Sequence, residues 1–232
     1  MTDGSPSVGG DSAPEVLLVL VGVTAWRQDR ERVSAYLKQH CTLDVRVPRV
    51  PYYFGLASAA RWLTRYLAHE IPANCKAIHV LNYIGGGFVF RTAGPRLASV
   101  PVGRTIHVRS PIQEQVSRRL IERYTRPLMV LFAGRSVLDL AGEAVDTIPV
   151  PALGSGKGLI VELKASRLAT RLGLSPNSVP ASAWSHDRLL PGADDAIDLP
   201  VDHDEAYGSP LLLDQVLHFI AHGRFKPTGT TP

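Results

Sequence analysis

Short apolar runs alternate along this chain with longer segments of helical periodicity, and this alternation limits most strongly the folds that the chain can adopt. Residues 16–21, VLLVLV, form a continuous apolar run of strand length, which is typical of a strand covered on both faces. The same reading predicts further strands at 43–47, 77–81, 105–108, 159–163 and 196–199, and helices at 29–40, 57–71 and 210–222. Strands separated by helices predict an α/β fold with a mostly parallel central sheet and helices on both faces.

The helix expected at 210–222 has clear boundaries in the sequence. Ser209 can cap it, Pro210 suits its first turn, and Gly223 can end it. In an open parallel sheet, a ligand binds outside the carboxyl ends of the strands. We therefore expect the functional residues in the segments that follow the predicted strands.

The composition is that of one folded domain. The chain has 232 residues, of which 45% are hydrophobic, and a net charge of +4 without a long basic run. We predict a single domain over 15–225, flanked by flexible tails at 1–14 and 226–232, and we expect no nucleic-acid partner. The longest apolar run is too short to span a membrane, and the N-terminus does not resemble a signal peptide, so we expect a cytoplasmic protein.

The most informative segment is 79–87, HVLNYIGGG, in which a predicted strand runs directly into three glycines. A strand that turns sharply into a helix with the pattern Gly-x-Ser-x-Gly carries the nucleophile of α/β-hydrolases. On this alignment Leu81 stands at the first glycine, Tyr83 at the nucleophile and Gly85 at the last glycine.

The C-terminal third extends the likeness. The segments 190–203, LPGADDAIDLPVDH, and 213–225, LDQVLHFIAHGRF, resemble the strand, catalytic histidine and closing helix of the bacterial lipase and esterase branch of the α/β-hydrolase superfamily. The segment 109–113, RSPIQ, is similar to the strand and turn that follow the nucleophile in that family. The resemblance covers residues 15–225 and implies an α/β-hydrolase fold with a small or reduced lid.

Carried over by position, the resemblance gives a degenerate catalytic triad. His203 takes the place of the general base, Tyr83 that of the nucleophile, and Asn177 or Pro176 that of the acid. The family's His-Gly after the first strand is replaced by Val21-Gly22. An oxyanion hole needs only backbone N–H groups, and Val23 and Ile84 would supply them.

Tyr83 has three interpretations in this position. It fills the pocket of a retired site, it orients a ligand, or it acts as a nucleophile or proton-transfer group. A conventional serine mechanism is not expected, because the nucleophile and the carboxylate that orients the histidine are both replaced.

Other residues are candidates for lining a ligand pocket. We expect Trp26, Tyr52, Tyr53, Ser110 and Trp184 to contact the ligand, because they follow predicted strands or lie in the loop before residue 191. The segment 113–139, rich in arginine, occupies the usual position of a lid; its default interpretation is a helix with a solvated basic face.

Two apparent motifs are set aside. The acidic stretch 202–205 matches no calcium loop, and we interpret it as a solvated turn rather than a metal site. The segment 154–158, GSGKG, lacks the first glycine and the Ser or Thr of a phosphate loop. We expect neither a metal nor a cofactor.

Three functions remain open. The first is a lipase-like protein without serine hydrolysis that binds an apolar or ester-like small molecule or a protein partner. The second is an active enzyme with unusual chemistry through Tyr83 and His203. The third is a structural subunit, for which a homo-oligomer is one possibility.

Overall fold

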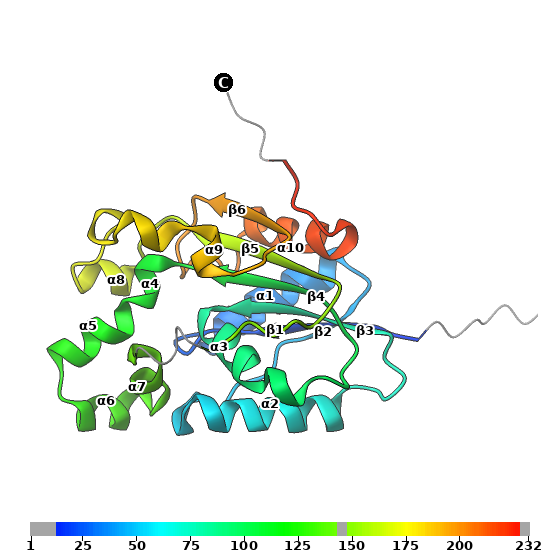
Figure 1. Cartoon of the computed structure of the whole chain (residues 1–232), viewed down its shortest axis with the longest axis horizontal. Helices are drawn as coiled ribbons and strands as arrows, with labels where there is room; N and C mark the ends of the chain where they lie inside the picture. Colours follow the sequence, from blue (N-terminus) through cyan, green and yellow to red (C-terminus); the bar gives the residue numbers. More distant parts are fainter. Residues whose placement is uncertain (1–12, 143–147, 228–232) are drawn as a thin grey trace, which may run out of the picture.

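A computed structural model describes residues 13–142 and 148–227. Most of the two predicted tails, 1–14 and 226–232, lies outside the described residues. The chain forms one sheet with helices packed on both of its faces (Figure 1). This arrangement confirms the predicted α/β architecture.

The sheet has six strands, all parallel, in the order β2-β1-β3-β4-β5-β6. The order places β3 and β4 at the centre, and β1, the apolar run that the sequence marks most clearly, lies next to β3. The strands are β1 Glu15–Leu20, β2 Asp44–Arg46, β3 Ala77–Tyr83, β4 Val102–Arg109, β5 Gly156–Glu162 and β6 Asp195–Leu199.

The helices divide between the two faces. The α-helices are α1 Arg27–His40, α2 Leu56–Glu70, α3 Ile84–Ala93, α4 Pro111–Glu114, α5 Val116–Arg123, α6 Arg126–Ala133, α7 Ser136–Ala141, α8 Arg167–Arg171, α9 His186–Leu189 and α10 Pro210–His222. Short 3-10 helices are η1 Tyr52–Phe54, η2 Gly94–Arg96, η4 Pro176–Ser178 and η5 Ala181–Trp184.

Alternate residues of the central strands face different helices. Leu17 and Val19 pack with α1 and α10, whereas Val16 and Leu18 pack with α2 and α3. This two-sided burial explains why β1 is apolar at every position rather than at every second one.

Helices α4–α7 connect β4 to β5 and project beyond the carboxyl ends of the strands (Figure 1). They include the segment 113–139, which the resemblance assigns to the usual position of a lid. Within the described residues, no helix has both the length and the apolar character needed to cross a membrane.

Candidate functional site

The bend between β3 and α3 brings the start of a helix to the carboxyl edge of the sheet. Tyr83 ends the strand with an extended backbone (φ −80°, ψ 158°), and Ile84 is the first residue of the helix. Among the residues that the structure describes, only glycines have positive φ. The bend is therefore unstrained, unlike the nucleophile turn of an α/β-hydrolase.

The glycines after Ile84 allow α3 to lie directly against β1. A Cβ atom built on Gly86 would stand 2.1 Å from the carbonyl oxygen of Leu20. A Cβ on Gly85 would stand 3.1 Å from the backbone nitrogen of Val23, but one on Gly87 would meet nothing closer than 3.5 Å. The position without room for any side chain is thus Gly86, two residues after Ile84.

A cavity of about 550 Å³ opens beside this bend. Its walls come from the loop after β1, helix α3, the end of β4, helices α4, α5 and α7, the segment around α9, and the loop after β6. The residues that line the cavity include Val23, Ile84, Gly85, Phe88, Arg91, Arg109 and His203.

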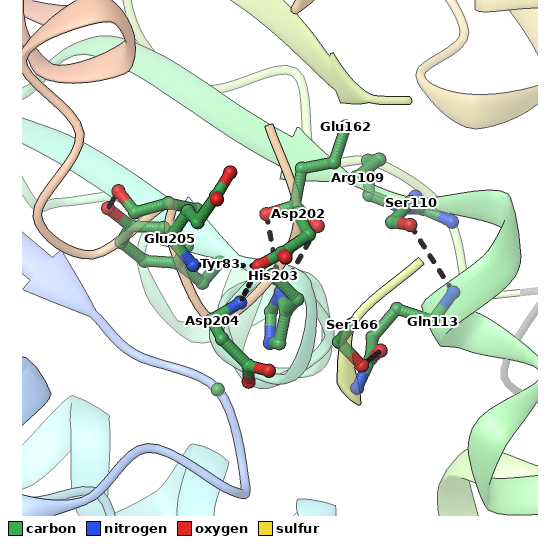
Figure 2. A network of polar contacts seen from close by, with 12 residues as sticks. Tyr83, Arg109, Ser110, Gln113, Glu162, Ser166, Asp202, His203, Asp204 and Glu205 are labelled. Atoms are coloured by element: carbon green, nitrogen blue, oxygen red, sulfur yellow. Dashed lines mark hydrogen bonds and ion pairs between the residues drawn. The ribbon is translucent and has the colours of Figure 1, made fainter. Parts of the chain in front are cut away.

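His203 lies at the edge of the cavity, held by a carboxylate on β5. Both carboxylate oxygens of Glu162, the last residue of that strand, lie 3.2 Å from Nδ1 of His203 (Figure 2). Glu162 is fully buried, and His203 is 4% exposed. The arrangement reproduces the pairing by which a carboxylate fixes the tautomer of a general base.

The second nitrogen of this imidazole is also occupied within the protein. The backbone N–H of Gly22 donates to the hydroxyl of Tyr207 at 3.2 Å, and this hydroxyl lies 3.3 Å from Nε2 of His203. A buried chain therefore runs from Gly22 through Tyr207 and His203 to Glu162.

The surroundings of this hydrogen-bonded series shift the pKa values of both His203 and Tyr207. Burial alone would lower the pKa of His203, but the Glu162 carboxylate outweighs it, with help from Asp204 and Asp202, so the pKa is raised. Burial also raises the pKa of the Tyr207 phenol well above its ordinary value. The phenol thus stays neutral and keeps its proton for hydrogen bonding.

The structure corrects the position of Tyr83. Its side chain is fully buried in the core, with its ring centre 4.4 Å from that of Tyr207 and its hydroxyl donating to the carbonyl of Ala206 at 3.2 Å, and it is not among the described residues that line the cavity. The residue of the bend that lines the cavity is the next one, Ile84, which is 7% exposed. Successive residues leave a strand toward opposite faces, so a shift of one position exchanges a core residue for a site residue.

The structure also corrects the acid. Asn177 lies exposed in η4, whereas Glu162 contacts His203. Sequence reasoning missed Glu162, although a carboxylate that ends the apolar strand GLIVE was a usable signal. Both residues expected to supply backbone N–H groups, Val23 and Ile84, line the cavity.

None of the five predicted ligand-contact residues is among the described residues that line the cavity. Trp26 and Tyr53 are 78% and 52% exposed, and the buried Tyr52 turns its hydroxyl to the carbonyl of Val21. Ser110 caps α4 by accepting from Gln113 N at 3.3 Å, and Trp184 packs beside α9 (Figure 2 for Ser110).

The acidic stretch 202–205 forms a local turn. The carboxylate of Asp202 accepts hydrogen bonds from the backbone N–H groups of Asp204 and Glu205, both at 2.8 Å. Within the described ranges, no three His, Cys, Asp or Glu side chains gather to hold a metal ion.

Comparison with known proteins gives a clear result for the fold only. No protein-family profile and no curated protein sequence matches the chain. Among solved structures, it is similar to the mature Bacillus licheniformis lipase BlEst2 (TM-score 0.57, 16% identity, 94% of this chain and 96% of that one).

Two thioesterases are similar as well. The type II thioesterase YbtT of the yersiniabactin biosynthetic pathway gives a TM-score of 0.54 at 12% identity over 96% of this chain and 98% of that one. The NocB thioesterase domain, solved as a covalent complex with a fluorophosphonate nocardicin G analogue, gives 0.52 at 16% identity over 91% and 96%. These lipase and thioesterase neighbours, with the all-parallel sheet, show that the chain has the α/β-hydrolase fold.

Proposed function

We propose that this protein binds an apolar or ester-like small molecule at the site where lipases and thioesterases of this fold act, without hydrolysing it through an acyl-enzyme. One observation carries the proposal: the residue that lines the cavity at the first position of α3 is Ile84, whose side chain has no nucleophilic atom.

The packing of the glycines supports this register. The pattern Gly-x-Ser-x-Gly puts its last glycine two residues after the nucleophile. Gly86 makes the close approach to β1, so the pattern here reads Asn82-x-Ile84-x-Gly86, one residue later than the alignment on Tyr83. The serine is then replaced by isoleucine.

The state of the histidine supports the same conclusion. A general base needs one imidazole nitrogen directed at the proton it removes. Here Nδ1 contacts Glu162 and Nε2 contacts Tyr207, so both nitrogens already have partners within the protein. A retained, buried Glu162–His203 pair without a nucleophile is consistent with binding rather than with the serine route.

The test is labelling with a fluorophosphonate probe, with the NocB thioesterase domain as the positive control. The wild-type chain is expected to remain unlabelled. The double variant Ile84→Ser, Tyr207→Phe places a hydroxyl at the bend and releases Nε2 of His203; we expect it to be labelled at residue 84.

A matched control keeps the outcome specific. Tyr83→Ser with Tyr207→Phe should remain unlabelled, because position 83 faces the core. Adding Glu162→Gln to the active double variant should slow labelling by ~10²-fold or more, since the imidazole loses its orienting carboxylate. Labelling of the wild type at any serine would refute the proposal, and thermal melts would identify variants that fail to fold.

A second candidate is hydrolysis by directly activated water, which the buried Glu162–His203 pair favours. It requires that Tyr207 turn away and a water take its place on Nε2. Turnover of p-nitrophenyl esters by the wild type, abolished in His203→Gln, would favour this enzyme over a binding protein.

A further inference from the structure

Helix α6 carries apolar side chains on the surface of the protein, in the group of helices beyond the carboxyl edge of the sheet (Figure 1). Its sequence is RPLMVLFA, with no polar residue after the first position. A helix that is apolar on all sides is normally enclosed, either by a protein core or by lipid. In α6, however, Met129 is the only buried side chain among those described. Leu128 and Leu131, three residues apart and therefore on one face, are both exposed.

The η1 segment extends this apolar face. Gly134 directly follows α6, and a Cβ built on it would stand 2.6 Å from the Cα atom of Tyr53. The next N–H group, that of Arg135, donates to the carbonyl of Tyr53 at 2.8 Å. Tyr53 and its neighbour Phe54 are 52% and 71% exposed, and so is Tyr124, to 44%, just before α6. The apolar patch is defined as Tyr53, Phe54, Tyr124, Leu128 and Leu131.

Two exposed arginines accompany the patch and have no acidic partner. Arg123 ends α5 and Arg126 begins α6, and in the described part of the chain neither pairs with a carboxylate. The acidic side chains of α5 and α7 have other partners. Glu122 pairs with Arg119 at 2.9 Å, and Asp139 accepts a backbone N–H of α2 at 2.8 Å. The patch therefore combines apolar side chains with unpaired positive charge.

The form of the patch favours a lipid surface over a protein partner. Protein interfaces are anchored by side chains that fill pockets on either partner. None of the five patch residues is among the described residues that line the cavity at the bend or the two other cavities, of about 430 and 670 Å³. Projecting leucine and aromatic side chains with arginine beside them are typical of segments that lie in the headgroup region of a bilayer.

We infer that the apolar patch binds the surface of a bilayer that contains anionic lipid. Phe54 and Leu131 enter the boundary between headgroups and acyl chains, and Arg123 and Arg126 contact the lipid phosphates. The protein then lies on the membrane, and no helix has to cross it. Because the patch does not include the Glu162–His203 pair, this docking does not depend on what the cavity binds.

Cosedimentation of the whole chain with lipid vesicles tests the docking. One set of vesicles contains phosphatidylcholine alone, and the other contains equal parts of phosphatidylcholine and phosphatidylglycerol. Binding to the anionic vesicles should be ~10-fold or more tighter, because each arginine near an anionic surface strengthens binding by about 5-fold. Added salt should weaken this binding, because it screens the charges.

Apolar variants with a matched control locate the contact. Leu128→Gln and Leu131→Gln should each weaken binding to the anionic vesicles by ~10-fold, because each removes an apolar side chain from the lipid. Leu211 lies on α10, outside the patch, and is 45% exposed, close to the 42% of Leu128. Leu211→Gln should leave vesicle binding unchanged.

Charge variants test the anionic preference separately. The double variant Arg123→Gln, Arg126→Gln should bind the two kinds of vesicle with nearly equal affinity. Arg171→Gln removes an exposed charge on α8 and should keep the preference. All these positions are exposed, and thermal melts should confirm that the variants remain folded.

The results that would overturn the docking are distinct. Absence of vesicle binding by the wild type would overturn it, as would an equal loss in Leu131→Gln and Leu211→Gln. Sedimentation velocity examines a second copy of the chain as the occupant. A wild-type dimer that Leu131→Gln converts to a monomer, without vesicle binding, would assign the patch to that copy. Binding to soluble poly-L-glutamate but not to vesicles would assign it to an acidic protein.

Discussion

Two adjacent glycines in α3 are predicted to respond in opposite ways to the same added methyl group. Gly86 and Gly87 lie in the same turn of one helix, and both are buried. A Cβ at 86 would stand 2.1 Å from the carbonyl oxygen of Leu20 and 2.6 Å from its carbonyl carbon, whereas a Cβ at 87 would be at least 3.5 Å from any neighbour.

The structure gives the size of each effect. Replacing glycine by alanine inside a helix stabilises by about 0.5–1 kcal/mol when the space is free, so Gly87→Ala should raise the free energy of unfolding by this amount. At 86 the methyl group falls about 1.2 Å inside an ordinary carbon–oxygen contact. The obstacle is backbone and cannot rotate away, so α3 must move from β1, at a cost of about 3–5 kcal/mol.

Equilibrium unfolding in urea, followed by far-ultraviolet circular dichroism, measures both variants. With a denaturant slope of about 2–3 kcal/mol per molar, the midpoint should fall by more than about 1 M for Gly86→Ala and rise by about 0.3 M for Gly87→Ala. Midpoints that shift equally, or a loss confined to Gly87→Ala, would refute the contact between α3 and β1. The register that places Ile84 at the cavity would then lose its support.

Three further predictions concern buried side chains. Tyr83→Phe removes the hydrogen bond to Ala206 and should cost about 1 kcal/mol of stability without changing ligand affinity, as measured by urea unfolding and calorimetry; a loss of affinity would place Tyr83 in the site after all. Burial and then Arg109 and Arg91 lower the pKa of His107 to about 3. Below pH 6.5 the unfolded chain therefore binds a proton that the folded chain does not, and stability falls with pH. The loss should reach about 3 kcal/mol at pH 4.5 and be absent in His107→Gln, as urea midpoints at pH 7.5 and 4.5 would show; an equal acid loss in both proteins would contradict it. Glu162→Gln should lower the pKa of His203 in an NMR titration, and an unchanged pKa would mean that the ion pair does not form in solution.

The sheet could be predicted because its signal is local. Leu17 and Leu18 point to opposite faces of β1 and are both apolar, which already indicates a strand buried between two layers. The boundaries of β4 were less accurate, since it extends over Val102–Arg109 rather than 105–108. The additional residues at its start, 102–104, are VGR, in which a glycine and a charged residue weaken the apolar signal.

The site could be predicted only in part. Three consecutive glycines allow three alignments of the nucleophile pattern, of which two put a side chain, Tyr83 or Ile84, at the nucleophile. Nothing near them in the sequence distinguishes these two. The distinction comes from Leu20, more than sixty positions away, whose carbonyl leaves no room for a side chain at Gly86. Glu162 reaches His203 because β5 pairs with β6 in register, with Glu162 opposite Leu199 just before the loop that carries the histidine.

The sequence by itself therefore determined the sheet of this protein: where the six strands lie, where three of the long helices that cover them lie, and that the sheet is mostly parallel. These properties follow from periodicity, which each segment carries within itself. Tertiary structure alone decided that Ile84 rather than Tyr83 lines the cavity. It also decided that Glu162 contacts Nδ1 of His203 and that the hydroxyl of Tyr207 contacts Nε2 of the same imidazole. Each of these depends on a contact between residues distant in the chain, and such contacts form only when the whole core packs.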